Sequence, residues 1–385
     1  MLSLDEVAAR NERLVAGLMT GTSMDGLDVA ICRIEPGDRL DFELLAFDTV
    51  SMPDDLRRAL EPDQLTSIAA VARLNQRLGL YFADALAKIT PRLARGVDLI
   101  GSHGQTVYHE HGVTSLQLGE PGPLAARFGC PVVSDFRMND IALGGSGAPL
   151  VPYVDQRLLG RKGEALLAIN IGGISNFTSL PGDPLASDRV IGMDCGPGNM
   201  LMDGLAARWS AGREKADVDG RLALKGEVDG DLLAWLQSHP FFAETPRPSA
   251  GREQFGEHFL DRILERTGTD LENETAVAAL MATLAAFSAW GMVDAYRRFV
   301  APASPVAQVI VSGGGSRNPA LMAGLRQGFG NIPVNASDAC GLPVDAKEAI
   351  AFAILASDRV DRRPTSLPSV TGASRQALLG KITEC

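Results

Sequence analysis

Residues 17–31 read GLMTGTSMDGLDVAI. Apolar runs at residues 14–19 and 27–34 flank a short loop of Gly, Thr, Ser and Asp, and the pair Asp25-Gly26 is typical of tight turns. The pattern therefore predicts a β-hairpin, with an ordinary surface turn as the alternative. Its glycines would let the backbone approach a ligand, and successive N–H groups in such a turn form a concavity that suits anions.

Two further stretches repeat this pattern. Residues 165–180 read ALLAINIGGISNFTSL, which is again a strand, a Gly-rich polar turn and a strand. Residues 306–318 read VAQVIVSGGGSRN, a third apolar strand that runs into a Gly/Ser loop and is followed by a predicted helix. The repetition predicts a duplicated nucleotide-binding fold, in which two hairpins face each other and a third loop lies nearby.

The remaining pattern predicts an α/β protein of two or three domains, a size that 385 residues allow. We place the first domain at residues 1–132 plus about 360–385, and the second at 133–359. Beyond the hairpins, we expect strands at 41–50, 97–102, 131–134 and 189–194, and helices at 54–60, 66–89, 122–128, 152–159, 199–209, 231–238, 256–266, 274–299, 318–327 and 346–357.

Composition and charge argue against several classes of protein. The formal net charge is −11, which argues against a general nucleic-acid binder, so an anionic ligand has to be met by local donors. Five scattered cysteines without a C-x-x-C pair fit reduced thiols in a cytoplasm. We expect no secretory peptide at the acidic N-terminus, and the apolar residues 276–293 predict a buried helix and no membrane span.

Several common phosphate and metal motifs are absent. The sequence contains no G-x-x-x-x-G-K-[ST], no protein-kinase signature set and no H-E-x-x-H. A phosphate cradle would therefore have to be built from the two hairpins.

Seven collinear motifs carry a resemblance to a known family. They are GTSMDGLD at 21–28, SHGQT at 102–106, FRMNDIALGGSGAPLVP at 136–152, NIGGISNFT at 170–178, MDCGPGNMLMD at 193–203, VSGGGSRNP at 311–319 and DAKEAIAFA at 345–353. Together they resemble the anhydro-N-acetylmuramic acid kinase family across nearly the whole chain. Small departures are Thr20, where the family usually has Ser, and Met193 and Cys195, where it commonly has Phe and Thr.

The resemblance implies a fold and a reaction. The fold is two RNase H-like (actin-like ATPase) domains with a nucleotide cleft between them. The family uses ATP and Mg²⁺ to phosphorylate O6 of 1,6-anhydro-N-acetylmuramic acid, and it opens the anhydro bridge with water in the same reaction. The product is N-acetylmuramic acid 6-phosphate, made during cell-wall recycling. No nucleic-acid or membrane partner is expected, and a homodimer is left open.

Asp194 is the predicted general base. It is the last residue of an apolar strand and precedes Gly196-Pro197-Gly198, and one carboxylate is needed to take a proton from the water that attacks the anomeric carbon. No second acid is required, because O6 can pass directly to the γ-phosphoryl group. The alternative is that Asp194 caps the following helix.

The nucleotide contacts are predicted at the glycine-rich loops. The first hairpin and the second are expected to hold the phosphates through N–H and hydroxyl donors, and the third loop resembles the adenosine-contact loop of the superfamily. These residues are Gly21, Thr22, Ser23, Met24, Asp25, Gly26, Leu27, Asp28, Gly172, Gly173, Ser175, Asn176, Gly313, Gly314, Gly315 and Asn318. Asp25 and Asp28 are the candidate Mg²⁺ ligands, through water, although both could simply form turns.

Substrate contacts are predicted at His103, Gln105, Arg137, Asp140 and Glu348. Arg137 offers a fork for the lactyl carboxylate of muramic acid, and His103 and Gln105 can bond sugar hydroxyls or the acetamido group. The alternatives are a structural His103 and, for Glu348, a favourable charge in the first turn of a helix. Two other functions stay open: a kinase of the same fold for another anhydrosugar such as levoglucosan, and a non-enzymatic ATPase switch.

Overall fold

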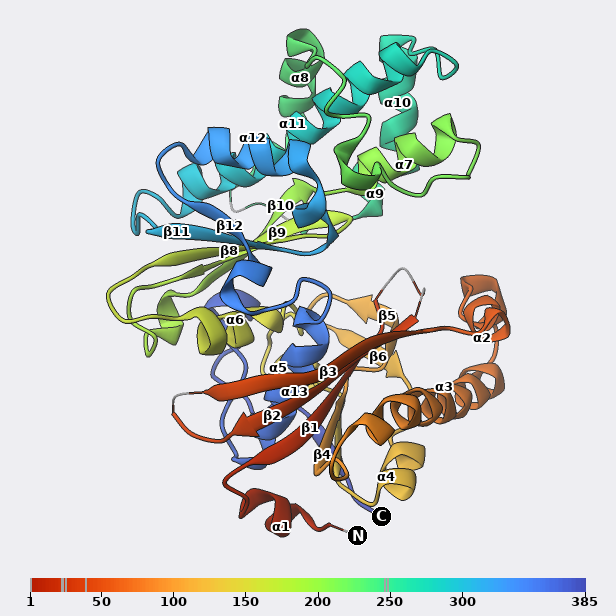
Figure 1. Ribbon diagram of the computed structural model, residues 1–385, viewed down its shortest axis with the longest axis vertical. Coiled ribbons are helices and arrows are strands. Elements are labelled where there is room, and N and C mark those ends of the chain that lie inside the picture. Colours follow the sequence, from red (N-terminus) through yellow and green to blue (C-terminus); the bar gives the residue numbers. More distant parts are fainter. Residues whose placement is uncertain (1, 22–23, 25, 39, 246, 248) are drawn as a thin grey trace. The chain divides into compact units, whose positions relative to one another are not determined.

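A computed structural model describes residues 2–21, 24, 26–38, 40–245, 247 and 249–385 (Figure 1). The chain forms two compact units. Unit 1 comprises Met1–Leu158 with Ala346–Cys385, and unit 2 comprises Leu159–Asp345. The predicted boundaries differ from this division, because residues 133–158 and 346–359 belong to unit 1 and not to the second domain.

Unit 1 is built around a six-stranded sheet in the order β13-β7-β4-β1-β2-β3, with a separate two-stranded sheet of β5 and β6. The strands β1, β2 and β3 are antiparallel neighbours, whereas β4 and β7 continue the sheet in parallel. Its elements are α1 (Leu4–Ala8), β1 (Arg13–Met19), β2 (Gly26–Glu35), β3 (Asp41–Ser51), α2 (Asp54–Ala59), α3 (Ile68–Ile89), β4 (Leu99–Ser102), β5 (Gln105–Glu110), β6 (Thr114–Leu118), α4 (Gly122–Phe128), β7 (Val132–Ser134), α5 (Met138–Ile141), α6 (Val151–Leu159), α13 (Lys347–Val360), α14 (Pro368–Thr371) and β13 (Lys381–Thr383).

Unit 2 repeats the same arrangement with a five-stranded sheet in the order β10-β9-β8-β11-β12. Again three antiparallel strands, β8, β9 and β10, are followed by two parallel ones. Its elements are β8 (Leu166–Ile171), β9 (Ile174–Leu180), β10 (Ile191–Pro197), α7 (Met200–Trp209), α8 (Gly230–Gln237), α9 (Arg252–Phe255), α10 (Glu257–Thr267), α11 (Glu274–Phe299), β11 (Gln308–Ser312), α12 (Pro319–Phe329) and β12 (Val334–Ala336). The shared order confirms the predicted α/β class and the predicted duplication.

The core of unit 2 lies between its sheet and its helices. Strand residues Leu167, Ile169 and Ile171 pack in one cluster with the buried side chains of α7, α11 and α12, and these helices lie on one side of the sheet in Figure 1. Helix α11 is long and apolar enough to cross a membrane, but 78% of its most apolar window is buried inside the protein. It is therefore a core helix, as the sequence predicts.

Helix α13 explains why the C-terminal segment belongs to unit 1. Alternate residues of β1 point to opposite faces of the sheet, so Ala16 and Leu18 pack toward α3 while Gly17 faces α13. A Cβ atom on Gly17 would lie 1.9 Å from the carbonyl oxygen of Ala349. Gly17 is paired with Gly101 on β4, and a Cβ atom there would lie 2.1 Å from the carbonyl oxygen of Phe352. The two paired glycines form a flat shelf on which the α13 backbone rests.

Helix α6 is fastened to the same helix. Tyr153 donates its hydroxyl hydrogen to Asp358 Oδ2 at 2.7 Å, and Lys347 Nζ lies 2.7 Å from Asp155 Oδ1 in a buried ion pair. These contacts join residues far apart in the sequence and hold the segment 133–158 in unit 1.

The glycine shelf gives a test of this packing. We expect Gly17→Ala to lower the free energy of unfolding by about 3 kcal/mol, because the added methyl group meets backbone atoms that can move only with the whole helix. Gly96→Ala is the matched control, since its Cβ atom would meet nothing within 4 Å. Urea denaturation of both variants checks this, and equal stability would show that α13 does not depend on the shelf.

Candidate functional site

The first hairpin is confirmed as β1 and β2, which pair from Arg13↔Ile34 to Met19↔Asp28. Its predicted loop residues Thr22, Ser23 and Asp25 lie outside the described residues, whereas Gly21, Met24 and Gly26–Asp28 are described. Leu27 points into the hydrophobic core, so only its backbone could meet a ligand. Asp28 accepts a 2.6 Å hydrogen bond from the Thr49 hydroxyl.

Arg137 and His103 form the best-defined polar pair of unit 1. His103 is buried, with its ring centroid 4.6 Å from that of Phe352 on α13. Its Nδ1 lies 2.9 Å from the carbonyl oxygen of Gly104, which makes Nδ1 the protonated nitrogen. The lone pair of Nε2 then accepts from Arg137 Nη2 at 2.8 Å and Nε at 3.2 Å. Both ring nitrogens of His103 are therefore used inside the protein.

The contacts of Arg137 leave a usable fork. Its Nη1 also donates to the Gly147 carbonyl at 2.9 Å, so three of the five N–H bonds that a guanidinium carries are engaged by His103 and Gly147. One N–H on each Nη has no protein acceptor among the described residues, and this pair suits a carboxylate that binds with both oxygens. Burial lowers the pKa of Arg137 to about 10, which leaves it charged at neutral pH.

Two other candidates for substrate contact in unit 1, Gln105 and Asp140, differ in how their side chains are hydrogen-bonded. Gln105 is buried beside Gly21, and its enclosed Oε1 has no hydrogen-bond partner among the described residues. Asp140 is fully buried and accepts from Gly147 N at 2.9 Å and Thr371 Oγ1 at 2.8 Å. Its carboxylate holds the glycine loop that contacts Arg137.

Glu348 stands in the first turn of α13. Burial raises the pKa of Glu348, the negative charge of Asp28 raises it further, and Lys347 and Arg137 oppose the shift. Glu348 and Asp28 are therefore close enough to repel each other, and a cation or a hydroxyl donor beside them would relieve that repulsion.

Neutral His103 predicts a pH effect on stability. Burial, with the nearby Arg137 charge, lowers the pKa of His103 to about 3, against about 6.5 in an unfolded chain. Between these values only the unfolded state binds the proton, so the free energy of unfolding falls as the pH falls from 6.5. We expect His103→Gln to lose this contribution, which amounts to about 1.4 kcal/mol per pH unit at most. Urea denaturation between pH 7 and 4 measures how steeply the free energy of unfolding changes with pH. His111→Gln, in an exposed loop, is the control. Equal pH slopes in the wild type and His103→Gln would contradict the prediction.

In unit 2, a row of polar side chains crosses four strands. Asp194 on β10 is paired with Asn176 on β9, Asn176 with Asn170 on β8, and Asn170 with Ser312 on β11. Directly paired residues point to the same face of a sheet. This is the face opposite Ile169 and Ile171, which pack against the helices. The row therefore places a carboxylate, two amides and a hydroxyl side by side.

The sequence predicts Asp194 at the end of its strand, but Asp194 lies within β10. The strand continues to Pro197 because a bulge between Asp194 and Gly196 absorbs the break in pairing, and Gly196 has a φ of 119° that favours glycine. The N-cap of α7 is Asn199, so the alternative in which Asp194 caps that helix is wrong. Asp194 Oδ2 instead accepts from Ala250 N at 2.8 Å. Burial raises the pKa of Asp194, and the Ala250 hydrogen bond partly offsets the rise.

The glycine loops of unit 2 meet around Ile171. Gly172 and Gly173 form the tip of the β8–β9 hairpin and accept hydrogen bonds from the backbone N–H groups of residues 198–200 at 2.8–3.1 Å. A Cβ atom on Gly315 would lie 2.2 Å from Ile171 Cγ2, and Gly313 has a φ of 79°. The second and third predicted loops are thus brought together, with Gly314 in the short 3-10 helix η6 (Gly314–Arg317).

Two predicted nucleotide contacts in unit 2 have internal partners. The Ser175 hydroxyl is buried and donates to the Gly196 carbonyl at 3.1 Å. Asn318 caps α12 and accepts from Ala320 N at 3.0 Å. The hydroxyl of Ser175 therefore stabilises the bulge beside Asp194, and the side chain of Asn318 caps the helix that follows the third loop.

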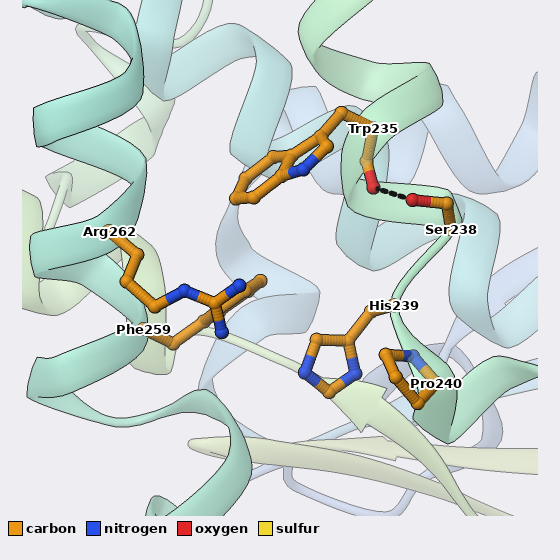
Figure 2. Close-up of a pocket in the computed structure, with 6 residues that line it drawn as sticks. All are labelled: Trp235, Ser238, His239, Pro240, Phe259 and Arg262. Atoms are coloured by element: carbon orange, nitrogen blue, oxygen red, sulfur yellow. Dashed lines mark hydrogen bonds between the residues drawn. The ribbon is translucent and has the colours of Figure 1, made fainter.

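Figure 2 shows a pocket of about 250 Å³ elsewhere in unit 2. The rings of Trp235 and Phe259 form its walls, with the Arg262 guanidinium 5.7 Å from the Phe259 centroid. It is lined by Trp235, Ser238, His239, Pro240, Phe259 and Arg262. None of these residues belongs to the predicted site, so the pocket is separate from the Asp194 row.

Comparison with known proteins decides the family. Residues 13–385 match the family described as anhydro-N-acetylmuramic acid kinase. The chain belongs to this family. Curated proteins named anhydro-N-acetylmuramic acid kinase include one from Caldanaerobacter subterraneus, 37% identical over 97% of this chain and 98% of that protein. Another, from Salinibacter ruber, is 40% identical over 97% of each.

Two solved structures show a more distant similarity. An activator of 2-hydroxyisocaproyl-CoA dehydratase from Clostridium difficile with bound ADPNP is 12% identical, with a TM-score of 0.44 over 91% of this chain and 96% of that one. A ROK family glucokinase from Streptomyces griseus with glucose and AMPPNP is 16% identical, with a TM-score of 0.39 over 89% and 99%.

Membership in the anhydro-N-acetylmuramic acid kinase family confirms the resemblance drawn from the seven motifs. The sequence reasoning nevertheless missed Asn170 and Ser312 in the polar row and Ala250 beside Asp194. Asn170 carried a signal, since it interrupts an apolar strand next to the glycine tip. Ala250 carried none, because a backbone N–H donor has no residue preference.

Proposed function

We propose that the protein transfers the γ-phosphoryl group of ATP to O6 of 1,6-anhydro-N-acetylmuramic acid while water opens the anhydro bridge. Membership in the kinase family is the observation that carries this proposal. The unit-2 geometry supports it, since a partly buried carboxylate with a raised pKa stands in a polar row next to glycine loops.

The reaction is balanced with one base. Asp194 takes a proton from water as the water oxygen bonds to the anomeric carbon, and the bond from that carbon to O6 breaks. O6 bonds to the γ-phosphorus, and the bond between that phosphorus and the bridging oxygen breaks to release ADP. Asn176 and Asn170 can orient the water, because they offer amide donors and acceptors in the same row as the carboxylate.

In unit 1, Arg137 would bind the lactyl carboxylate through its two remaining N–H bonds. The Oε1 of Gln105, which has no partner among the residues that the structure describes, would accept a hydroxyl or amide hydrogen of the sugar. His103 holds Arg137 in place and does not itself touch the sugar, since both of its nitrogens are engaged.

Mg²⁺ fits the carboxylates of unit 1. Among the described residues no group of three or more His, Cys, Asp or Glu side chains could hold a metal ion, and a hydrated Mg²⁺ needs only one or two carboxylates. We propose Asp28 as that ligand. Glu348 is close enough to Asp28 for their charges to interact, so the charge of the ion would also attract the Glu348 carboxylate. When bound, Mg²⁺ neutralises charge on the phosphates.

The test is mass spectrometry of the product formed in ¹⁸O-water. We expect one ¹⁸O atom in the sugar and none in the phosphate. Short reaction times and a control with unlabelled N-acetylmuramic acid 6-phosphate correct for exchange at the anomeric carbon. Label in the phosphate, or none beyond the control, would contradict water attack at the sugar.

A further inference from the structure

Arg247 is a buried cation beside the predicted general base. Its side chain is 0% exposed. Nη1 donates to two backbone carbonyls, those of Cys195 and Gly291, at 2.9 Å each. Nη2 donates to the carboxylate of Asp294 on α11. One guanidinium thus links a loop, a strand and a helix of unit 2.

The surroundings explain how the charge is tolerated. Asp294 supplies the opposite charge, and the guanidinium carbon lies 5.0 Å from the ring centroid of Phe242 and 5.8 Å from those of Phe241 and Phe299. Aromatic faces attract a cation, and a desolvated site strengthens that attraction. A buried charge with this many partners is held in one geometry, because the loss of a partner leaves a buried charge or a buried acceptor without compensation.

The backbone that Arg247 holds carries Asp194. Cys195, whose carbonyl accepts from Arg247, is the residue between Asp194 and the bulge glycine Gly196. Three residues after Arg247, the Ala250 N–H donates to Asp194 Oδ2. Arg247 therefore bonds to the strand from which the base projects, and it stands three residues before the N–H that donates to the carboxylate of the base.

The bulge is closely packed from behind. A Cβ atom on Gly291 would lie 3.0 Å from the Cys195 oxygen, and one on Gly196 would lie 3.0 Å from Phe242 Cζ. Helix α11 and the Phe242 ring thus pack against the backbone that Arg247 contacts, and little room remains for the backbone of residues 195 and 196 to move.

We propose that Arg247 is a positioning residue for the general base, which it holds through the Cys195 carbonyl and the Ala250 N–H. This inference rests on the proposed role of Asp194. Arg247 does not touch substrate, since its side chain is enclosed by unit 2 itself.

The key variant is Arg247→Lys, which keeps the charge but lacks the planar fork that reaches two carbonyls and a carboxylate together. We expect kcat to fall about a hundredfold, as for a misplaced catalytic group, with the KM values for ATP and sugar unchanged. The acid limb of the kcat profile should also move to higher pH, because the Ala250 hydrogen bond that lowers the pKa of Asp194 is weakened. Amide hydrogen exchange of Ala250 should become faster.

Arg297→Lys is the matched control. Arg297 lies on the same helix as Asp294 and donates to the Gly328 carbonyl at 2.7 Å, with no bond to Asp194 or Cys195. We expect its kcat, pH profile and Ala250 exchange to equal those of the wild type.

A second variant guards against misfolding. Arg247→Met with Asp294→Leu removes both charges together, which a core tolerates better than one unpaired charge. We expect it to fold, to lose kcat to at least the same degree, and to show fast Ala250 exchange. A folded variant of either kind with wild-type kcat and pH profile would overturn the inference.

Asp194→Asn in parallel separates the two proposals. If that variant is inactive while Arg247→Lys is normal, the positioning role is wrong and the base assignment stands. If Asp194→Asn is itself active, the base assignment is wrong, and the positioning role falls with it whatever the Ala250 exchange shows.

Discussion

Asp194→Asn is expected to lower kcat at least about a thousandfold, equivalent to roughly 4 kcal/mol of transition-state stabilisation. The amide has the size of the carboxylate and can still accept the hydrogen bond from Ala250 N, so the local structure is preserved while the proton acceptor is lost. Steady-state ADP release in the presence of the sugar measures the loss. The KM for ATP should change little, because water activation is a transition-state interaction.

The pH dependence gives the same prediction a second readout. Burial raises the pKa of Asp194, and a base works only when deprotonated. The acid limb of the wild-type kcat profile should therefore lie above the ordinary Asp pKa of about 3.9, with activity falling as the pH falls through it. Asp188→Asn, on an exposed residue just before β10, should keep both the rate and the limb. Near-normal turnover of Asp194→Asn would remove this residue from the role.

The parts of the fold that follow from local sequence were predictable. Both hairpins were predicted because apolar runs flank Gly-rich turns, and turn chemistry is decided within a few residues. The small sheet of β5 and β6 was missed, because residues 105–118 contain charged and polar side chains on an exposed surface and show little apolar alternation. Local patterns indicate what is buried, and a hairpin that is mostly exposed has no such pattern.

The predicted domain boundaries differ from the two units of the structure for another physical reason. Helix α13 was predicted, but its unit is decided by Gly17 and Gly101, which are 84 residues apart and paired in the sheet. Nothing within the helix's own sequence indicates that shelf. The buried pair of Lys347 and Asp155 joins residues that are even further apart in the chain, so the assignment of residues 133–158 also depended on tertiary contacts.

The candidate site, like the fold, could be predicted only where the signal lies in the local sequence. Asp194 and Arg137 could be chosen because a charged residue beside glycines in an apolar context is unusual and because the motifs resemble a known family. Asn170, Ser312 and Arg247 could not, because their relation to Asp194 depends on strand register and on a loop that returns to the bulge. His103 was identified, but only the structure shows that both of its nitrogens are already engaged.

Arg137→Ala is expected to raise the KM for 1,6-anhydro-N-acetylmuramic acid about a hundredfold with little change in kcat. Two charge-assisted hydrogen bonds to a partly buried carboxylate are worth about 3 kcal/mol, and the carboxylate is remote from the atoms that react, so binding is lost equally in the ground state and the transition state. Anhydrosugars without the lactyl group, such as levoglucosan and 1,6-anhydro-N-acetylglucosamine, should be turned over equally by the variant and the wild type.

Controls separate recognition from folding in this case. Arg127→Ala removes an arginine of unit 1 that pairs on the surface with Asp84, and it should change neither substrate's kinetics. Arg137→Ala also leaves the His103 Nε2 and the Gly147 carbonyl without their donor, so its stability must be measured alongside. A loss that is equal for sugars with and without the lactyl carboxylate would mean that Arg137 supports the fold of the site and does not read the substrate. It would also favour a kinase for a different anhydrosugar, because the carboxylate is the feature that distinguishes the muramic compound from its neutral analogues.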